Sequence, residues 1–212
     1  MLELIKAGGI LIWPILLCSI ISLAIIAERF WSLQNNKICP KNLVAQVWDW
    51  NRKGQLDAKR ILSLKNSSQL GRVLAAGLVN RHHERHIMKE SIEEVGRHVV
   101  HELGKFLTTL GTIASITPLL GLLGTVIGMI KVFTVITTLG LGDPAVLAEG
   151  ISVALITTAA GLTVAIPSLM FYRYFQGKID EIVINMEQEA LKMVEVMHGQ
   201  REQETSTENK SQ

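Results

Sequence analysis

The chain has 212 residues, of which 48% are hydrophobic, and its mean hydropathy is positive at +0.30. Most soluble domains have fewer apolar residues, and this composition is typical of a small polytopic membrane protein. The net charge is only +2, which gives no reason to expect a nucleic-acid partner.

Three runs without a charged residue are each long enough to cross a bilayer, and they cover residues 7–27, 106–130 and 150–172. A helix rises about 1.5 Å per residue, so roughly 20 apolar residues span the hydrocarbon core. The first run lacks a small-residue cleavage site after its apolar stretch and is therefore predicted to be a retained signal-anchor helix. Trp13 and Trp31 lie near its two ends, where indole side chains favour the headgroup region.

The positive charge is unevenly distributed around these runs. Residues 31–105 hold 13 Lys or Arg and the tail after Tyr172 holds five, whereas the connector 137–150 holds none. The positive-inside rule therefore places residues 31–105 and the tail in the cytoplasm. It leaves the N-terminus and the connector on the outer side, and an odd number of spans agrees with ends on opposite sides.

The segment before the second run is predicted to be helical. Residues 40–80 have the apolar spacing of short amphipathic helices, with Gly54 ending one of them and Asn66-Ser67-Ser68 as a turn and N-cap before another. Apolar residues then recur at steps of three and four into the second span: Met88, Ile92, Val95, Val99, Leu103 and Phe106. This spacing predicts one continuous helix from about His86 to beyond Ile130.

A heptad pattern follows the third span. Its apolar positions are Ile179, Val183, Met186, Ala190, Met193 and Met197. The pattern predicts a helix with a buried seam, whereas the polar residues 200–212 lack periodicity and are expected to be disordered. Cys18 lies inside the first span and Cys39 beyond it, so a disulfide would distort that span and both cysteines are expected to be free.

The second and third spans are unusually rich in Gly, Ala, Ser and Thr. They contain TPLLGLLGTVIGM at 117–129 and ISVALITTAAGLTVAIPS at 151–168. Small residues let helix backbones approach closely, and hydroxyls can face other helices or a wet lumen. The expected helix-packing positions are Gly121, Gly124, Gly128 and Gly161, and helix kinks are expected at Pro118 and Pro167.

Threonines in these two spans are the candidate functional residues. A membrane threonine often bonds only to the carbonyl four residues earlier, and this interpretation is favoured for Thr117 and Thr163. Thr125 and Thr158 lie on the small-residue faces and are predicted, together with Thr157, to line an ion path. No Asp, Glu or His lies inside the three uncharged runs. Because a proton relay normally needs an ionisable group, the titrating residue would have to come from another chain.

Other chemistry finds little support in the sequence. His82 and His86 are one helical turn apart, a spacing that can bind zinc, but no further ligand follows at a suitable spacing. A solvated surface is the favoured interpretation of this cluster. The sequence holds neither a Gly-rich phosphate loop nor a Ser/His/Asp order, so no metal, no cofactor and no enzymatic activity are expected.

The residues PLLGLLGTVxG at 118–128 and GIxxALxTTAxGLxxAIP at 150–167 resemble the ExbB/TolQ branch of the MotA/TolQ/ExbB proton-channel family. The resemblance covers essentially the whole chain. It implies a ring, expected to be a pentamer, in the bacterial inner membrane around the single-span helices of an ExbD/TolR-like dimer. The partner's Asp would carry the proton, and motion would pass to a TonB- or TolA-like protein. It also implies that Thr125 and Thr158 are polar pore residues.

The expected fold is an all-α membrane protein with three transmembrane helices and long cytoplasmic helical extensions, assembled as a ring among membrane lipids. The expected segments are a periplasmic end with transmembrane helix 1 (1–30), a cytoplasmic helical segment (31–105), transmembrane helix 2 (106–136), a periplasmic connector (137–149), transmembrane helix 3 (150–174), a cytoplasmic C-terminal helix (175–199) and a disordered tail (200–212).

Val153 departs from the family pattern, since this branch carries a Glu at that position in GIxEAL. The leading interpretation is a non-enzymatic energy transducer, the ring-forming subunit of a proton-driven motor. The departure keeps a second interpretation open, a non-conducting scaffold that assembles and stabilises an ExbD-like partner. The sequence leaves open whether a TonB, a Tol or another system is served.

Overall fold

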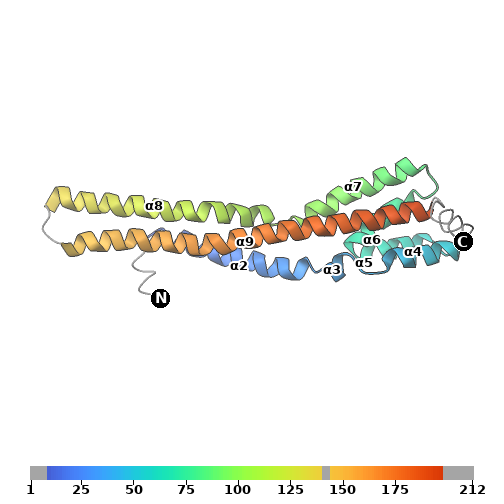
Figure 1. The fold of residues 1–212 in the computed structure, drawn as a ribbon, viewed down its shortest axis with the longest axis horizontal. Coiled ribbons are helices and arrows are strands. Elements are labelled where there is room, and N and C mark those ends of the chain that lie inside the picture. The colour runs from blue at the N-terminus through green and yellow to red at the C-terminus, as the bar shows by residue number, and fades with distance from the viewer. Residues whose placement is uncertain (1–8, 140–143, 198–212) are drawn as a thin grey trace, which may run out of the picture. The chain divides into compact units, whose positions relative to one another are not determined.

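A computed structural model describes residues 9–139 and 144–197, and α-helix is the regular structure found in these ranges (Figure 1). The helices are α2 (Ile12–Ser32), α3 (Asn35–Ile38), α4 (Leu43–Arg52), α5 (Ala58–Ser67), α6 (Gln69–Val79), α7 (Arg85–Leu103), α8 (Leu107–Leu139) and α9 (Pro144–Met197). They form two compact units. The membrane unit comprises the described residues 9–29 and 106–176, and the polar unit comprises 30–105 and 177–197.

Three helices are long and apolar enough to cross a membrane: α2, α8 and α9. The expectation of an all-α membrane protein with three transmembrane helices is thereby confirmed. α9 is one helix of 54 residues, so the third span and the heptad segment after it are continuous. Both α8 and α9 remain helical through their prolines, Pro118 and Pro167. The expected disorder of residues 200–212 lies outside the described residues.

The prediction of one helix from His86 to beyond Ile130 is wrong. α7 ends at Leu103 and α8 begins at Leu107. Between them, Phe106 has a left-handed backbone with φ of +63°, a conformation that a helix does not contain. The Phe106 ring lies 5.6 Å from the guanidinium of Arg29, whose side chain is only 3% exposed. This contact is made with a residue far away in sequence, so the apolar spacing could not reveal the break.

A hydroxyl pair joins α2 to α9 inside the membrane unit. The Oγ atoms of Ser22 and Ser168 lie 2.7 Å apart, and both side chains are buried. Interhelical hydrogen bonds of this kind help to hold membrane helices together, because lipid offers no competing partner. Large apolar side chains of α8 and α9 point outward instead, among them Leu119, Leu122, Val126, Leu155, Leu162 and Ile166. In a membrane this outward face contacts lipid or other chains.

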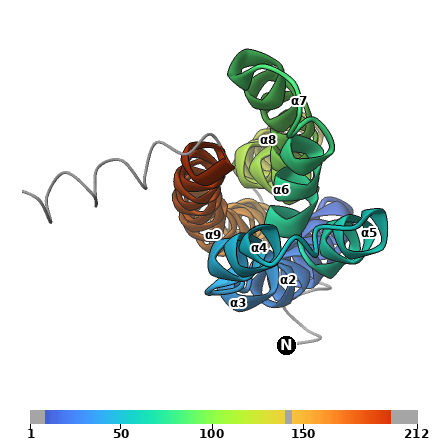
Figure 2. The same cartoon turned by 90° about the vertical axis from the view of Figure 1, so that its right-hand side faces the viewer.

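The polar unit has its own apolar core around α6, which packs against α5 and α7 (Figure 2). Ser68 is the N-cap of α6, since the Gly71 N–H donates to its Oγ at 3.0 Å. The cap lies in the stretch predicted for it, but Asn66 and Ser67 belong to α5 and do not form the expected turn. The heptad prediction is confirmed by the burial of most of its positions. The core includes Leu70, Leu74, Leu78, Met88, Ile179, Ile182, Met186, Ala190 and Met193. The two cysteines are free, as expected.

Candidate functional site

The centre of the membrane unit is a contact between α8 and α9 in which glycines of one helix meet small residues of the other. A Cβ atom added at Gly124 would lie 2.5 Å from Cγ2 of Thr157, and one at Gly128 would lie 2.9 Å from Cβ of Ala154. Because real Cβ atoms do not approach so closely, a larger residue at either position must push the helices apart. We call this contact the glycine seam.

Two further glycines belong to the glycine seam where the helices come closest. A Cβ added at Gly161 would lie 2.7 Å from the carbonyl oxygen of Thr117, and one at Gly121 would lie 3.0 Å from Cα of Thr158. The four glycines proposed for packing therefore lie on one contact between two helices of the same chain. The sequence could indicate a close contact, but it could not show that the partner helix is α9 of the same chain.

Thr158 bonds across the glycine seam. Its hydroxyl donates to the carbonyl oxygen of Gly121 at 3.0 Å. The carbonyl of a helical residue normally accepts only from its own helix, and the missing side chain of Gly121 is what lets α9 reach it. The hydroxyl thus fixes the position of α9 along α8.

The other candidate threonines donate within their own helices. Thr157 is fully buried and donates to the carbonyl of Val153 at 2.7 Å, and half-buried Thr125 donates to Leu122 at 2.6 Å. The oxygen of half-buried Thr125 keeps a lone pair with which it can accept a hydrogen bond from water. Thr117 and Thr163 each bond to the carbonyl four residues earlier, Ile113 and Ala159, as predicted for them.

A cavity of about 250 Å³ adjoins the glycine seam toward the α8–α9 connector. Its lining includes Gly9 to Leu11, which come just before α2, and Lys131, Glu149, Val153 and Thr157. This volume has room for several water molecules, and Lys131 and Glu149 are charged residues of its lining. Glu149 is thus a carboxylate that shares a cavity with one of the candidate threonines.

Sequence reasoning did not find this cavity. Lys131 and Glu149 flank the connector, and nothing local in the sequence says that their side chains share a space. The glycine seam brings α8 and α9 together closely enough to put both residues on one cavity. Val153, the position that departs from the family pattern, is half-buried on its wall.

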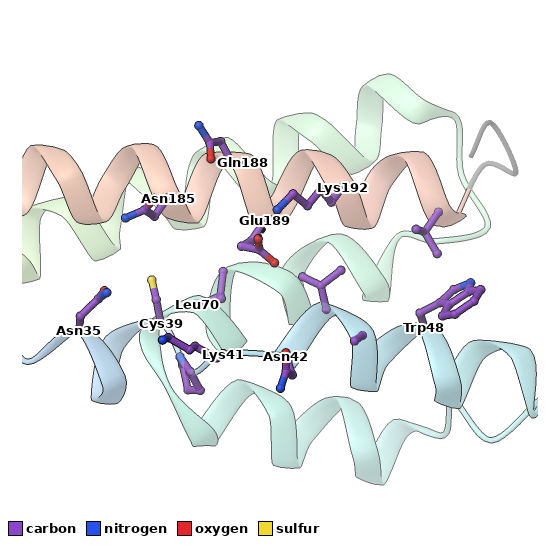
Figure 3. Close-up of a pocket in the computed structure, with 14 residues that line it drawn as sticks. Asn35, Cys39, Lys41, Asn42, Trp48, Leu70, Asn185, Gln188, Glu189 and Lys192 are labelled. Carbon is purple, nitrogen blue, oxygen red and sulfur yellow. Dashed lines mark hydrogen bonds and ion pairs between the residues drawn. The ribbon is translucent and has the colours of Figure 1, made fainter. Parts of the chain in front are cut away.

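The polar unit has a larger groove of about 830 Å³ between α4 and the last turns of α9 (Figure 3). Cys39 and Glu189 point into it from opposite sides, and Lys192 is paired with Glu189 at 2.6 Å. Burial, and to a lesser extent the charge of Glu189, raises the pKa of the Cys39 thiol to about 11. A thiol of this kind is a poor nucleophile at neutral pH, which argues against Cys39 as a catalytic nucleophile.

The histidine cluster does not form a metal site in the part of the chain that the structure describes. His82 and His86 are both exposed, and no three His, Cys, Asp or Glu side chains gather as ligands in residues 9–139 and 144–197. His86 lies 3.2 Å from Glu84, and both side chains are exposed.

Comparison with known proteins extends these observations. The family described as the MotA/TolQ/ExbB proton channel family matches residues 65–188, which include α6, α7, α8 and most of α9. The chain belongs to this family. Together with the three apolar helices, this makes it a multi-pass membrane protein.

Several named proteins are similar to this chain over most of its length. An ExbB homolog of Methanothermobacter thermautotrophicus is 31% identical over 189 residues, 88% of this chain and 66% of that protein. An ExbB-like protein of Synechocystis is 35% identical, over 78% of this chain and 66% of that protein. The biopolymer transport protein exbB1 of Vibrio cholerae is 32% identical, over 76% of this chain and 72% of that protein. The chain thus spans slightly less than two thirds of the length of the first two relatives.

Proposed function

We propose that this chain is the ring-forming subunit of an ExbB/TolQ-like complex of the inner membrane that uses the proton-motive force for biopolymer transport. Several copies, five by resemblance to the family, would surround the single-span helix of an ExbD/TolR-like partner. A TonB- or TolA-like protein would receive the motion. The N-terminus would be periplasmic and the C-terminus cytoplasmic, in agreement with the distribution of Lys and Arg.

The observation that carries this proposal is the chemistry of the two helices that form the glycine seam. They present hydroxyls at Thr125, Thr157 and Thr158 but no Asp, Glu, His, Lys or Arg in residues 106–130 and 150–172. A threonine hydroxyl does not titrate near neutral pH, so it can orient water but cannot carry a proton alone. The proton carrier would therefore be the partner's Asp, with the threonines solvating the path around it.

The outward apolar face supports an assembly. Leu119 and Leu155 are 61% and 64% exposed in the isolated chain, although they lie in the middle of α8 and in the membrane part of α9. Lipid can cover part of this face, and neighbouring copies or the partner helix can cover the rest. The small residues are used within the chain, so contacts between chains would involve these larger side chains.

A non-conducting scaffold is the second candidate function, and Val153 is the residue that favours it. Its side chain replaces a carboxylate at a position that lines the cavity beside Thr157. No enzymatic activity is proposed, since the family is one of channel and transport proteins.

Proton flux into liposomes tests the proposal against this alternative. The protein is reconstituted alone, with the ExbD-like partner, and with a partner whose intramembrane Asp is changed to Asn. We expect little flux without the partner, clear flux with it, and assembly without flux for the Asn variant. Assembly with no flux in any arm would support the scaffold, and robust flux through the chain alone would refute the partner as the proton carrier.

A further inference from the structure

A polar groove of about 580 Å³ lies in the polar unit where α3, the end of α5 and the end of α7 meet. Three basic side chains line it: Lys37, Lys65 and Arg72. The hydroxyl residues Ser67 and Ser68 also line it. Such a mixture of ammonium, guanidinium and hydroxyl groups suits an oxyanion rather than an apolar ligand.

The charges in this groove do not cancel. Arg72 donates from Nη1 to both carboxylate oxygens of Glu102, at 2.8 and 2.9 Å. This contact lowers the pKa of the Glu102 carboxyl, so the carboxylate is ionised and its charge is matched by Arg72. Neither Lys37 nor Lys65 makes an ion pair within the described residues. Two positive charges are therefore left for a ligand.

One buried atom in the groove also lacks a partner. Gln69 donates from Nε2 to Glu102 at 3.3 Å, but its Oε1 is buried and accepts no hydrogen bond from the described residues. A flipped amide would turn its oxygen toward the carboxylate, so the present orientation is the favourable one. Because this atom is buried, a ligand in the groove cannot reach it, and the exposed side chains of Lys37 and Lys65 are left as the contacts.

The chain position of the groove points to the source of the ligand. Its lining includes Ser32, the last residue of the membrane helix α2, and Leu103, four residues before α8 begins. Lys37 lies 5.1 Å from the ring of Trp31, which is 70% exposed. An exposed Trp beside a Lys at the end of a membrane helix is typical of the headgroup region. Some residues that line this groove are thus only a few residues in sequence from the ends of membrane helices.

We propose that this groove binds the headgroup of an anionic phospholipid, with its phosphate on Lys37 and Lys65. Phosphatidylglycerol has the required phosphodiester. Basic pockets beside membrane helices on the cytoplasmic side recognise anionic headgroups in this way. The assignment of this headgroup to the cytoplasmic leaflet rests on the membrane orientation given in the proposed function. The binding chemistry does not depend on that orientation.

Native mass spectrometry of the full-length protein in detergent tests the proposal. The probes are dioctanoyl phosphatidylglycerol, dioctanoyl phosphatidylcholine and inorganic phosphate. We expect phosphatidylglycerol to bind more tightly than phosphatidylcholine. Lys65→Gln should weaken phosphatidylglycerol binding about fivefold, the effect of roughly one juxtamembrane basic residue.

Lys59→Gln is the matched control. Lys59 is exposed on the same helix α5, does not line the groove, and its replacement removes the same charge. Equal loss of binding in the two variants would overturn the proposal, as would equal binding of the two lipids. Displacement of phosphatidylglycerol by millimolar inorganic phosphate would refute the proposal that the ligand is a lipid. It would indicate a site for free anions instead. Proton flux is not measured, so failure here is separate from failure of the proposed function.

Discussion

The hydroxyl of Thr158 in α9 donates to the carbonyl oxygen of Gly121 in α8, at 3.0 Å. Interhelical hydrogen bonds in membrane proteins contribute on average about 0.6 kcal/mol and at most about 1.7 kcal/mol. Thr158→Val should therefore lower stability within that range, measured as unfolding in mixed micelles. Thr163→Val is the control, because Thr163 is exposed and bonds only to Ala159 of its own helix. Equal effects of the two changes would show that the bond to Gly121 contributes nothing.

Thr125 allows a test of conduction that is separate from stability. Its hydroxyl bonds only within α8, to Leu122, so Thr125→Val should leave unfolding nearly unchanged. If the oxygen solvates the ion path, proton flux of the complex reconstituted with its partner should fall severalfold. Flux equal to that of the unchanged protein, at equal assembly, would remove Thr125 from the path.

The glycine seam predicts a large effect of a single methyl group. In Gly124→Ala the new Cβ would lie 2.5 Å from Cγ2 and 2.7 Å from Cβ of Thr157, so α8 and α9 must separate. We expect a loss of about 1–3 kcal/mol, typical of overpacking. Gly177→Ala is the matched control in α9, because nothing lies within 4 Å of a Cβ added there. A thermal shift in detergent should separate them, and similar melting temperatures would contradict this packing.

Val153→Glu tests the cavity beside the glycine seam. Val153 is half-buried on the wall of the cavity that also holds Lys131, so a carboxylate there can reach water and a nearby cation. The variant should fold and keep the oligomer mass of the unchanged protein. Ala154→Glu should not, because Ala154 is only 3% exposed and packs against Gly128 of α8, which leaves no room for a longer side chain. Equal loss of assembly in both variants would argue against an open cavity at residue 153.

Cys39 gives a pH-dependent prediction in the polar unit. Its thiol has a pKa raised from 9.0 to about 11, chiefly by burial, so the folded protein holds this proton while the unfolded chain releases it. Stability should be unaffected below about pH 9 and should fall as the pH rises from 9 toward 11. In a Cys18→Ala background, reaction with N-ethylmaleimide should reach half its maximal rate near pH 11 in the folded protein. In urea the half-maximal rate should lie near pH 9, and the same value in both states would contradict burial of the thiol.

Much of the membrane unit can be predicted from the sequence, because its signals are local in the chain. Uncharged length gives the three spans, and glycines four residues apart indicate a close helix contact. The bonding of Thr117 and Thr163 to their own helix is also local. The residue that each glycine contacts is not a local feature of the chain, since Gly124 contacts Thr157, which is 33 residues away. Periodicity states which face is buried, but it does not state against which helix.

The break before α8 is a feature that the sequence did not predict. Apolar positions from Met88 to Phe106 fit one helix, yet the helix stops at Leu103. Phe106 keeps its left-handed backbone where its ring meets the buried guanidinium of Arg29, in α2. A residue with a Cβ is rare in this conformation, and no local preference of Phe predicts it. Only the long-range contact accounts for it.

The small side chains of the glycine seam also determine how the helix pair responds to temperature. Separating α8 from α9 within a bilayer replaces contacts between helices by contacts with lipid and exposes little apolar surface to water. Exposure of apolar surface to water is the main source of the heat-capacity increase when soluble proteins unfold. The enthalpy of separating α8 from α9 should therefore be nearly constant with temperature. Cooling weakens an apolar core in water, but it should not weaken the contact between these two helices. The stability of the α8–α9 contact would therefore change little over a range of growth temperatures, whereas the stability of the apolar core of the polar unit would change with temperature.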